Sequence, residues 1–468
     1  MNQTASITST PLVCRGPATD AAVVAMANLS AAQGIDLTQH QPLAVKVRQW
    51  VTPEGARASF TAVRDRPMFD LALRFRAGSA LDGDSPGLAA LVLYSLDQGT
   101  EQLDNAQFAQ LLEGHGAIMN RSISHDEAVV TLRCLSLPAL RTSALSLFTQ
   151  MLAQPALRPA DVARIRERLA TVQRARAWYP STRMSDATMA HLFADHPYAI
   201  PVTGTAEGLD AITNEQLRAF HQRAYSANNV DIGLVGNLSP EEAQQLVADL
   251  VKALPQNWAA QAPETSLPPN TRTQHLEKTG TTTSIMLTVP ATVSPGNPWH
   301  PALVMLDEIL GGGFESRLTQ ELRVKRALTY SASSSLQPLD AANLLQIEWD
   351  IAPEYRDASC ALVANMLACL SNHGPSQVEC DVALSQLSGK LQHALASNEN
   401  LAKGLATFSH QGLPADHLAT YPNKLAALTP LDIREAAKAL LAETPHVLIS
   451  LGPDVEQQAL PSPPATDQ

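Results

Sequence analysis

Residues Leu310 to Leu336 read LGGGFESRLTQELRVKRALTYSASSSL, and the rest of the chain is organised around this stretch. It begins with three adjacent glycines, Gly311, Gly312 and Gly313. Such a run predicts a loop that needs either a positive φ or a close approach to its backbone. Residues 316–326 predict a short helix, for which Ser316 is an N-cap candidate. Residues 330–336 then predict a strand of small polar side chains.

Two side chains of this stretch could act on a ligand. Arg323, on the predicted helix, offers a cation with several N–H donors, and Tyr330, at the start of the predicted strand, offers a hydroxyl group. They stand seven positions apart across a helix-to-strand turn, and the glycines before them would let an extended ligand approach the backbone. The ordinary alternative is a surface arginine and a half-buried core tyrosine.

The glycine run, the helix with its arginine and the tyrosine after it resemble a motif in the C-terminal half of the pitrilysin/insulinase zinc metallopeptidases, the inverzincins. The resemblance is to their small bacterial and mitochondrial-processing-peptidase-like members. It implies that Arg323 and Tyr330 reach across a chamber and bind the substrate next to the zinc ion. It also implies that Gly311–Gly313 line the path of the substrate.

Composition narrows the classes of protein that the chain can belong to. Its 468 residues are too many for one ordinary core and suggest two or more domains. The net charge of −12 argues against a nucleic-acid partner, because neutralising phosphates requires a basic face. No uninterrupted apolar run of about 18 residues occurs, so no transmembrane helix is expected. Five cysteines without CxxC spacing indicate neither a disulfide framework nor a structural zinc site.

The first 47 residues are polar and rich in alanine, and we expect them to form an extension outside the core. They show neither the basic start nor the apolar run of a signal peptide. The compartment is therefore unknown from the sequence: periplasmic if a signal peptide has been removed, and cytoplasmic otherwise.

An internal repeat divides the chain. SLFTQML at 146–152 matches ALVANML at 361–367 with an offset of 215 residues, and AITNEQLRAFHQRA at 211–224 matches ALTPLDIREAAKAL at 427–440 with an offset of 216. Gly236 and Gly452 each follow an apolar strand and keep this offset. Landmarks that agree over such a distance predict two copies of one α+β unit.

The expected domain organisation follows from this repeat and from a stretch rich in Pro, Ala and Gln at 254–270, which predicts a linker. The five expected segments are an N-terminal extension (1–47), a first half (48–253), the linker (254–270), a second half (271–456) and a C-terminal tail (457–468). Each half is expected to contain a mainly antiparallel sheet with helices packed on one face. The resemblance implies the same α+β fold, with the two homologous halves facing each other across the chamber.

The zinc-binding motif of the family is absent from the first half. Active members carry H-x-x-E-H on the first helix of that half and a further Glu on a later helix; the two His and the distal Glu bind zinc. The matching helix here is GLAALVLYSLDQGT at 87–100, and the motif positions are occupied by Ala90, Leu93 and Tyr94. The distal position is Thr171, on a helix rich in arginine. Ala and Leu cannot ligate a metal, and one Tyr alone makes no site, so we expect no metal and no cofactor in this chain.

The combination of a lost zinc motif with a retained Arg323 and Tyr330 resembles the non-metal subunit of a two-chain peptidase. The resemblance implies a heterodimer with a homologous subunit that bears H-x-x-E-H and zinc, and an extended or unfolded peptide as substrate. No peptidase activity is expected from the chain alone. The alternatives are a structural subunit, like the core proteins of a respiratory complex, and a module that binds peptides without cleaving them.

Overall fold

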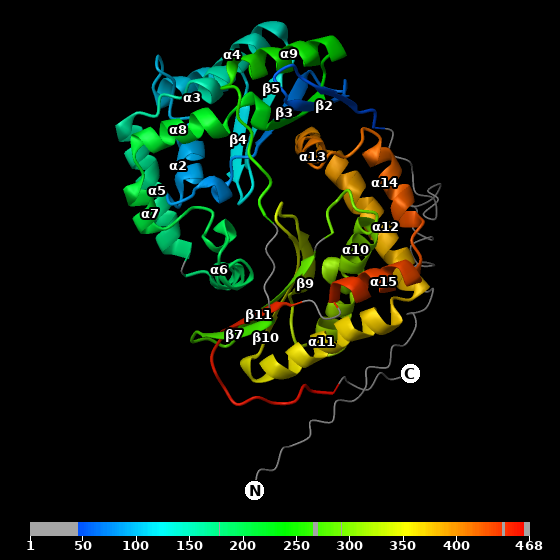
Figure 1. The fold of residues 1–468 in the computed structure, drawn as a ribbon. Coiled ribbons are helices and arrows are strands. Elements are labelled where there is room, and N and C mark those ends of the chain that lie inside the picture. The colour runs from blue at the N-terminus through cyan, green and yellow to red at the C-terminus, as the bar shows by residue number, and fades with distance from the viewer. Residues whose placement is uncertain (1–44, 177, 265–269, 292, 442–444, 463–468) are drawn as a thin grey trace.

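The computed structural model describes residues 45–462, except for residues 177, 265–269, 292 and 442–444. The expected N-terminal extension up to residue 44, part of the expected linker (265–269) and the end of the expected tail (463–468) lie outside the described residues. Figure 1 shows the described chain as two α+β halves that follow each other in sequence.

Each half is built on one sheet. The strands of the first half are β1 (Arg48–Val51), β2 (Arg57–Ala62), β3 (Met68–Phe75), β4 (Ile118–Ile123), β5 (Ala128–Leu135) and β6 (Val230–Gly236). Those of the second half are β7 (Arg272–Glu277), β8 (Thr283–Ala291), β9 (Ala332–Gln337), β10 (Asn343–Ile351) and β11 (Val447–Gly452). The first sheet has the order β1-β2-β6-β3-β5-β4, and the second has the order β7-β11-β8-β10-β9. Apart from the additional edge strand β1, the two orders are the same, which confirms the α+β fold with two homologous halves.

The pairing of the strands repeats as well. In each sheet one pair is parallel, β2 with β6 and β7 with β11, and the remaining neighbours are antiparallel. The two matching glycines serve the same purpose in both copies. A Cβ on Gly236 would lie 2.4 Å from the Cα of Phe69, and a Cβ on Gly452 would lie 2.8 Å from the Cα of Thr283. Both positions therefore need glycine because the neighbouring strand passes too close for a side chain.

The helices surround these sheets. Those of the first half are α2 (Leu88–Ser95), α3 (Asn105–Gly114), α4 (Pro138–Ala153), α5 (Pro159–Arg176), α6 (Pro180–Leu192), α7 (Ala206–Ala211), α8 (Asn214–Ala224) and α9 (Pro240–Ala253). Those of the second half are α10 (His300–Asp307), α11 (Arg356–His373), α12 (Gln377–Leu395), α13 (Asn398–His410), α14 (His417–Ala426) and α15 (Pro430–Leu441). No helix in the described ranges is long and apolar enough to cross a membrane.

The central strand β3 shows how the sheet separates two cores. Leu71 and Leu73 pack with helices of their own half, whereas Ala72 points to the opposite face and packs in a second apolar cluster. This alternation follows from the two-residue period of a strand. The helices of each half thus cover one face of its sheet, as predicted. The apolar residues on the other face must be buried by elements from elsewhere in the chain.

Each half supplies that cover to the other. Helix α13, from the second half, packs on β2, β3 and β6 of the first sheet, with Leu401, Leu405 and Ala406 against Val235. Helix α6, from the first half, packs on β8 and β11 of the second sheet, with Met184 in its apolar cluster. Figure 1 shows α13 below the first sheet and α6 beside β7 and β11. The two halves are therefore interlocked by an exchange of helices, which the sequence did not predict.

The contact between α13 and β6 leaves no room for a side chain on the strand. A Cβ on Gly233 would lie 1.9 Å from the backbone oxygen of Ala402. We expect Gly233→Ala to push α13 away and to lower the free energy of unfolding by about 3 kcal/mol, the upper end of overpacking costs. Gly389→Ala is a matched control, because nothing lies within 4 Å of its Cβ in α12. Denaturant titration should show a lower midpoint for the first variant and an unchanged or higher one for the control.

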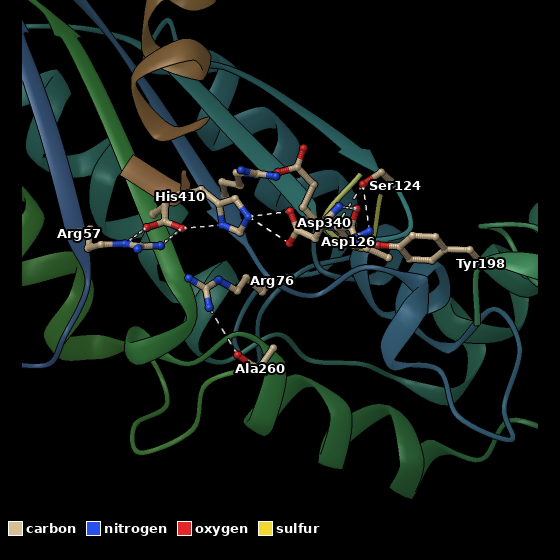
Figure 2. A network of polar contacts seen from close by, with 12 residues as sticks. Arg57, Arg76, Ser124, Asp126, Tyr198, Ala260, Asp340 and His410 are labelled. Carbon is tan, nitrogen blue, oxygen red and sulfur yellow. Dashed lines mark hydrogen bonds and ion pairs between the residues drawn. The ribbon is translucent and has the colours of Figure 1, made fainter. Parts of the chain in front are cut away.

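A buried polar network joins the two halves beside this contact (Figure 2). His410, at the end of α13, contacts Asp231 on β6 at 3.2 Å through Nδ1 and Asp340, between β9 and β10, at 2.9 Å through Nε2. Arg57 on β2 donates two hydrogen bonds to Asp231, of 2.6 and 2.9 Å. The side chain of Asp231 is 2% exposed and that of His410 is 10% exposed. One imidazole thus links carboxylates from the first and second halves.

The network continues into the loops of both halves. The backbone N–H of Asp340 donates to Asp126 at 3.0 Å, and the buried Tyr198 hydroxyl donates to the same carboxylate. The backbone N–H of Ala341 donates to the Tyr198 oxygen at 3.2 Å. Hydrogen bonds between the halves therefore extend from β2 to the loop between β9 and β10.

The described parts of the expected linker and tail are held by hydrogen bonds. The carbonyl of Pro255 accepts from the Ala227 N–H at 2.8 Å, and the Ala260 N–H donates to Asn229 at 2.9 Å. In the tail, the N–H of Gln458 donates to the Glu354 carbonyl at 2.7 Å. These segments pack on the first and second halves, respectively.

Candidate functional site

The structure brings Arg323 and Tyr330 together on an exposed surface of the second half. The Arg323 guanidinium carbon lies 5.9 Å from the centre of the Tyr330 ring and 5.5 Å from that of Phe314. Tyr330 is 91% exposed and Phe314 is 60% exposed, while Arg323 is also exposed. We call these three residues the Arg323 cluster. The alternative of a half-buried core tyrosine is wrong, because the phenol faces solvent.

A π-helical turn followed by a chain reversal positions this cluster. The predicted helix at 316–326 forms, but from Thr319 to Val324 it is a π-helix, η6, and Arg323 lies near its end. The turn after it is closed by the Ala327 N–H, which donates to the Arg323 carbonyl at 3.0 Å, and by the Leu328 N–H, which donates to the Leu322 carbonyl at 2.8 Å. Ala327 has a φ of 51°, a conformation that costs energy for a residue with a side chain. The chain therefore reverses sharply between Arg323 and Tyr330, and strand β9 begins two residues later than Tyr330.

Arg323 is the cation of this turn that stays without an acidic partner among the described residues. Glu321 binds the other two, with an ion pair to Lys325 at 2.5 Å and a second one to Arg326. Burial alone would raise the pKa of Glu321, but the hydrogen bonds from Lys325 and Arg326 outweigh it and hold the pKa below its usual value. The neighbouring cations are thus neutralised, and the charge of Arg323 is available to a ligand.

The glycine run lies next to the cluster, and close approach explains its composition. None of the three glycines has a positive φ. A Cβ would lie 2.3 Å from the Ser334 nitrogen at Gly311, 2.6 Å from Glu308 Oε2 at Gly312 and 2.0 Å from Gln386 Oε1 at Gly313. Of the two reasons that the sequence left open, close approach is confirmed, and the approaching groups belong to the protein itself.

An ion pair between an exposed lysine and a buried glutamate holds the same run. Lys390, on α12, donates to both oxygens of Glu308, at 2.9 and 2.6 Å, and to the carbonyl of Gly312 at 2.7 Å. The Glu308 side chain is 3% exposed. The run does not form the predicted loop: Gly311 and Gly312 end a π-helix, η5 (Glu308–Gly312), and Lys390 ties its last carbonyl to α12.

The positions that match the zinc motif do not fit a metal ion. Ala90 and Leu93 are completely buried in the apolar core of the first half. Thr171 is exposed, and its hydroxyl donates to the Glu167 carbonyl at 2.9 Å within its own helix. The Tyr94 ring has the guanidinium carbons of Arg121 and Arg168 at 5.4 and 5.5 Å from its centre. In the described ranges, no three His, Cys, Asp or Glu side chains are grouped so that they could hold a metal.

Sequence reasoning missed Phe314 as a member of the Arg323 cluster. Its signal was a large aromatic residue directly after a glycine run, outside the predicted helix and strand. It also missed the neutralisation of Lys325 and Arg326 by Glu321, for which the i, i+4 spacing from Glu321 to Lys325 was the signal.

Two family models match the chain and together cover most of both halves. The model of the insulinase family, peptidase family M16, matches residues 64–206, and the model described as the peptidase M16 inactive domain matches residues 211–387. The second match contains the glycine run and the Arg323 cluster. The first contains the positions at which the zinc motif is missing.

Solved structures and curated proteins agree with these matches. The structure of a peptidase M16 inactive domain from Pseudomonas fluorescens is 34% identical, covers 89% of this chain and all of that chain, and has a TM-score of 0.85. A non-peptidase homologue from Helicobacter pylori is 24% identical over 80% of this chain and 86% of its own length. An uncharacterised zinc protease from Mycobacterium leprae is 29% identical over 45% of this chain and 48% of its own length. The chain thus spans about half to two thirds of the mycobacterial relatives that it matches.

Proposed function

The chain belongs to the insulinase family of peptidases, family M16, and we propose that it is the non-metal-binding subunit of a two-chain zinc metallopeptidase. It groups with the non-catalytic members of that family, since its zinc positions carry none of the His and Glu ligands and it resembles inactive and non-peptidase relatives. In the proposed pair, a homologous subunit with the H-x-x-E-H motif holds the zinc ion. This chain contributes Arg323 and Tyr330, which bind the peptide at the partner's zinc site.

The observation that carries the proposal is the exposed Arg323, which has no acidic partner among the described residues, beside the exposed Tyr330. The Arg323 guanidinium packs against two aromatic rings, and the neighbouring Lys325 and Arg326 are neutralised by Glu321. Its N–H groups are therefore free to bind a ligand. A purely structural subunit has no need of such a group in a turn that holds a strained residue. The arrangement is suited to a ligand that carries negative charge or develops it.

Arg323 and Tyr330 would have different roles in the cleavage of a peptide bond. Arg323 would bind the substrate carbonyl or its neighbours through fixed donors. The Tyr330 hydroxyl would donate to the oxygen that becomes negative as the bond is attacked. The glycine run would lie along the path of the extended peptide, held in place by Lys390 and Glu308. The chemistry of bond cleavage itself would come from the partner's metal.

Reconstitution tests this proposal. The chain is mixed with a homologous subunit that carries H-x-x-E-H and zinc, and cleavage of an unfolded, fluorescently quenched protein is measured. We expect cleavage from the mixture, and none from this chain alone. Equal activity of the partner by itself would remove the proposed role.

A module that binds peptides without cleaving them is the second candidate. It is favoured by the exposure of Phe314 and Tyr330, which form an open apolar surface around a cation. Binding of the same unfolded substrate by this chain, together with no gain of cleavage on adding the partner, would support it.

A further inference from the structure

A second cationic cluster lies on the first half, at the end of the degenerate zinc motif. The Tyr94 ring, on α2, has the guanidinium carbon of Arg121 at 5.4 Å from its centre and that of Arg168 at 5.5 Å. Arg121 comes from β4 and Arg168 from α5, so three elements meet here. Figure 1 shows α2 between α5 and β4, and both elements contact α2. The Tyr94 ring, at the last position of the motif, thus contacts two cations.

One of these cations lacks a counter-charge. Arg121 forms an ion pair with Asp97. Three other arginines of α5 have acidic partners: Arg164 with Asp161, Arg174 with Glu167 and Arg176 with Asp186. Arg166, also on α5, donates to the Ile212 carbonyl at 2.7 Å. Within the described part of the chain, no carboxylate lies at ion-pair distance from Arg168, which is exposed. The cluster therefore has a surplus of one positive charge in a protein whose net charge is −12.

Two buried polar atoms of the first half also have unused hydrogen-bonding capacity. The Tyr225 hydroxyl and the Nε of Arg121 are buried and have no hydrogen-bond partner among the described residues. Tyr225 is completely buried, and burial raises the pKa of its hydroxyl. The charge of Arg121 opposes this shift, and Tyr94 adds to it. Leaving such buried donors unsatisfied costs free energy.

We propose that Tyr94, Arg121 and Arg168 form a site for the carboxylate of a peptide, either its C-terminus or an Asp or Glu side chain. A guanidinium and a phenol hydroxyl are the donors that a carboxylate prefers. A surplus of one charge fits a monoanion better than a phosphate dianion, and a divalent cation would be repelled. Strand β4 is the outer strand of its sheet, and the exposed Arg168 is the member of the cluster that faces solvent.

This site goes beyond the proposed two-chain peptidase, because it lies on the first half and needs no partner. In a family whose active members hold zinc with this helix, the loss of the metal would have made room for a substrate-recognition site. Peptides that end in, or carry, a carboxylate at the right place would then be held by this chain before any cleavage. The ordinary alternative is that the two arginines only stabilise the Tyr94 ring.

Calorimetric titration of the full chain distinguishes these cases. The probes are N-acetyl-tetraalanine with a free C-terminus, the same peptide as its C-terminal amide, and the amide with Asp at its third position. We expect saturable binding of at least one of the two carboxylate-bearing peptides and about tenfold weaker binding of the plain amide. The source of the carboxylate is given by which of the two binds.

Substitutions tie the effect to the cluster. Arg168→Gln should weaken carboxylate binding by about tenfold, and Tyr94→Phe should weaken it while keeping the ring in place. Arg174→Gln is the matched control, since Arg174 is exposed on the same helix and paired with Glu167. Thermal melts establish that each variant is folded.

Three results would overturn the proposal: equal binding of acid and amide, binding unchanged by Arg168→Gln, or no saturable binding of either carboxylate peptide. The assay contains no zinc-bearing subunit, so its outcome is independent of the reconstitution experiment.

Discussion

Replacing Tyr330 by phenylalanine should lower kcat of the reconstituted pair by about 10²–10³-fold, the usual cost of one donor to a developing oxyanion. The ring would stay beside Arg323, because the contact at 5.9 Å is made by the aromatic face and not by the hydroxyl. An interaction made only in the transition state affects kcat and kcat/KM alike and leaves KM nearly unchanged. Initial rates over a range of substrate concentrations measure this difference.

Tyr179→Phe is the control for this variant, since Tyr179 is a 61% exposed tyrosine on the first half and lies outside the Arg323 cluster. Arg323→Ala should lower the rate as well and should also raise KM, because the guanidinium would contact the substrate before the transition state. Unchanged kinetics for both Tyr330→Phe and Arg323→Ala would contradict the role of the cluster in cleavage while leaving reconstitution itself intact.

Replacing His410 by leucine should lower the free energy of unfolding by about 3 kcal/mol near pH 6, because it leaves two carboxylates of the inter-half network without their common partner. Asp231 is almost completely buried, and Arg57 would then be its remaining partner. His393→Leu is the control, since His393 is exposed on α12 and such substitutions change stability by about 0.5 kcal/mol or less. Urea titration at constant pH measures both.

The effect of His410 should depend on pH in a defined direction. Burial alone would lower the pKa of His410, but its hydrogen bonds to Asp231 and Asp340 outweigh burial and the opposing charge of Arg74, and the pKa is raised. A raised pKa means that the stabilisation is complete below about pH 6.5, the usual value for histidine, and is lost as the pH rises through the folded-state pKa.

The two carboxylates of the network act at the other end of the pH range. Burial would raise the pKa of Asp231 and of Asp340, but the hydrogen bonds with His410, and with Arg57 for Asp231, lower both. Their stabilisation is therefore present above about pH 4 and lost as the pH falls through their folded-state values. The difference between the wild type and His410→Leu should be largest between about pH 4 and 6.5. A difference that grew steadily towards pH 9 would contradict a charged His410.

Much of the fold could be predicted from the sequence because its signals are local. The stretch from Leu310 to Leu336 predicted a short helix followed by a strand, and the structure has η6 and β9 there. The repeat offset of about 216 residues predicted that one unit occurs twice, and the equal strand orders confirm it. The exchange of α6 and α13 was out of reach, because nothing in the sequence of an amphipathic helix says which sheet it covers.

The candidate site shows the same division. Arg323 and Tyr330 were singled out by their resemblance to a family motif, and the structure places them side by side. The reason for the glycine run was left open, because it depends on Ser334, Glu308 and Gln386, which are distant or unremarkable in the sequence. The network around His410 was not found either, since its hydrogen-bonded partners are up to 214 residues apart and each is an ordinary polar residue by itself.

The exchanged helices mean that neither half is complete as a separate product. A truncation that ended after the first half would strip Leu401, Leu405 and Ala406 from β6 and leave the apolar side chain of Val235 bare. Removing the first half would uncover Met286 and Ile449 in the same way. Bare apolar strand faces invite aggregation. The two halves must therefore be expressed and engineered together as one chain, although they repeat one structural unit.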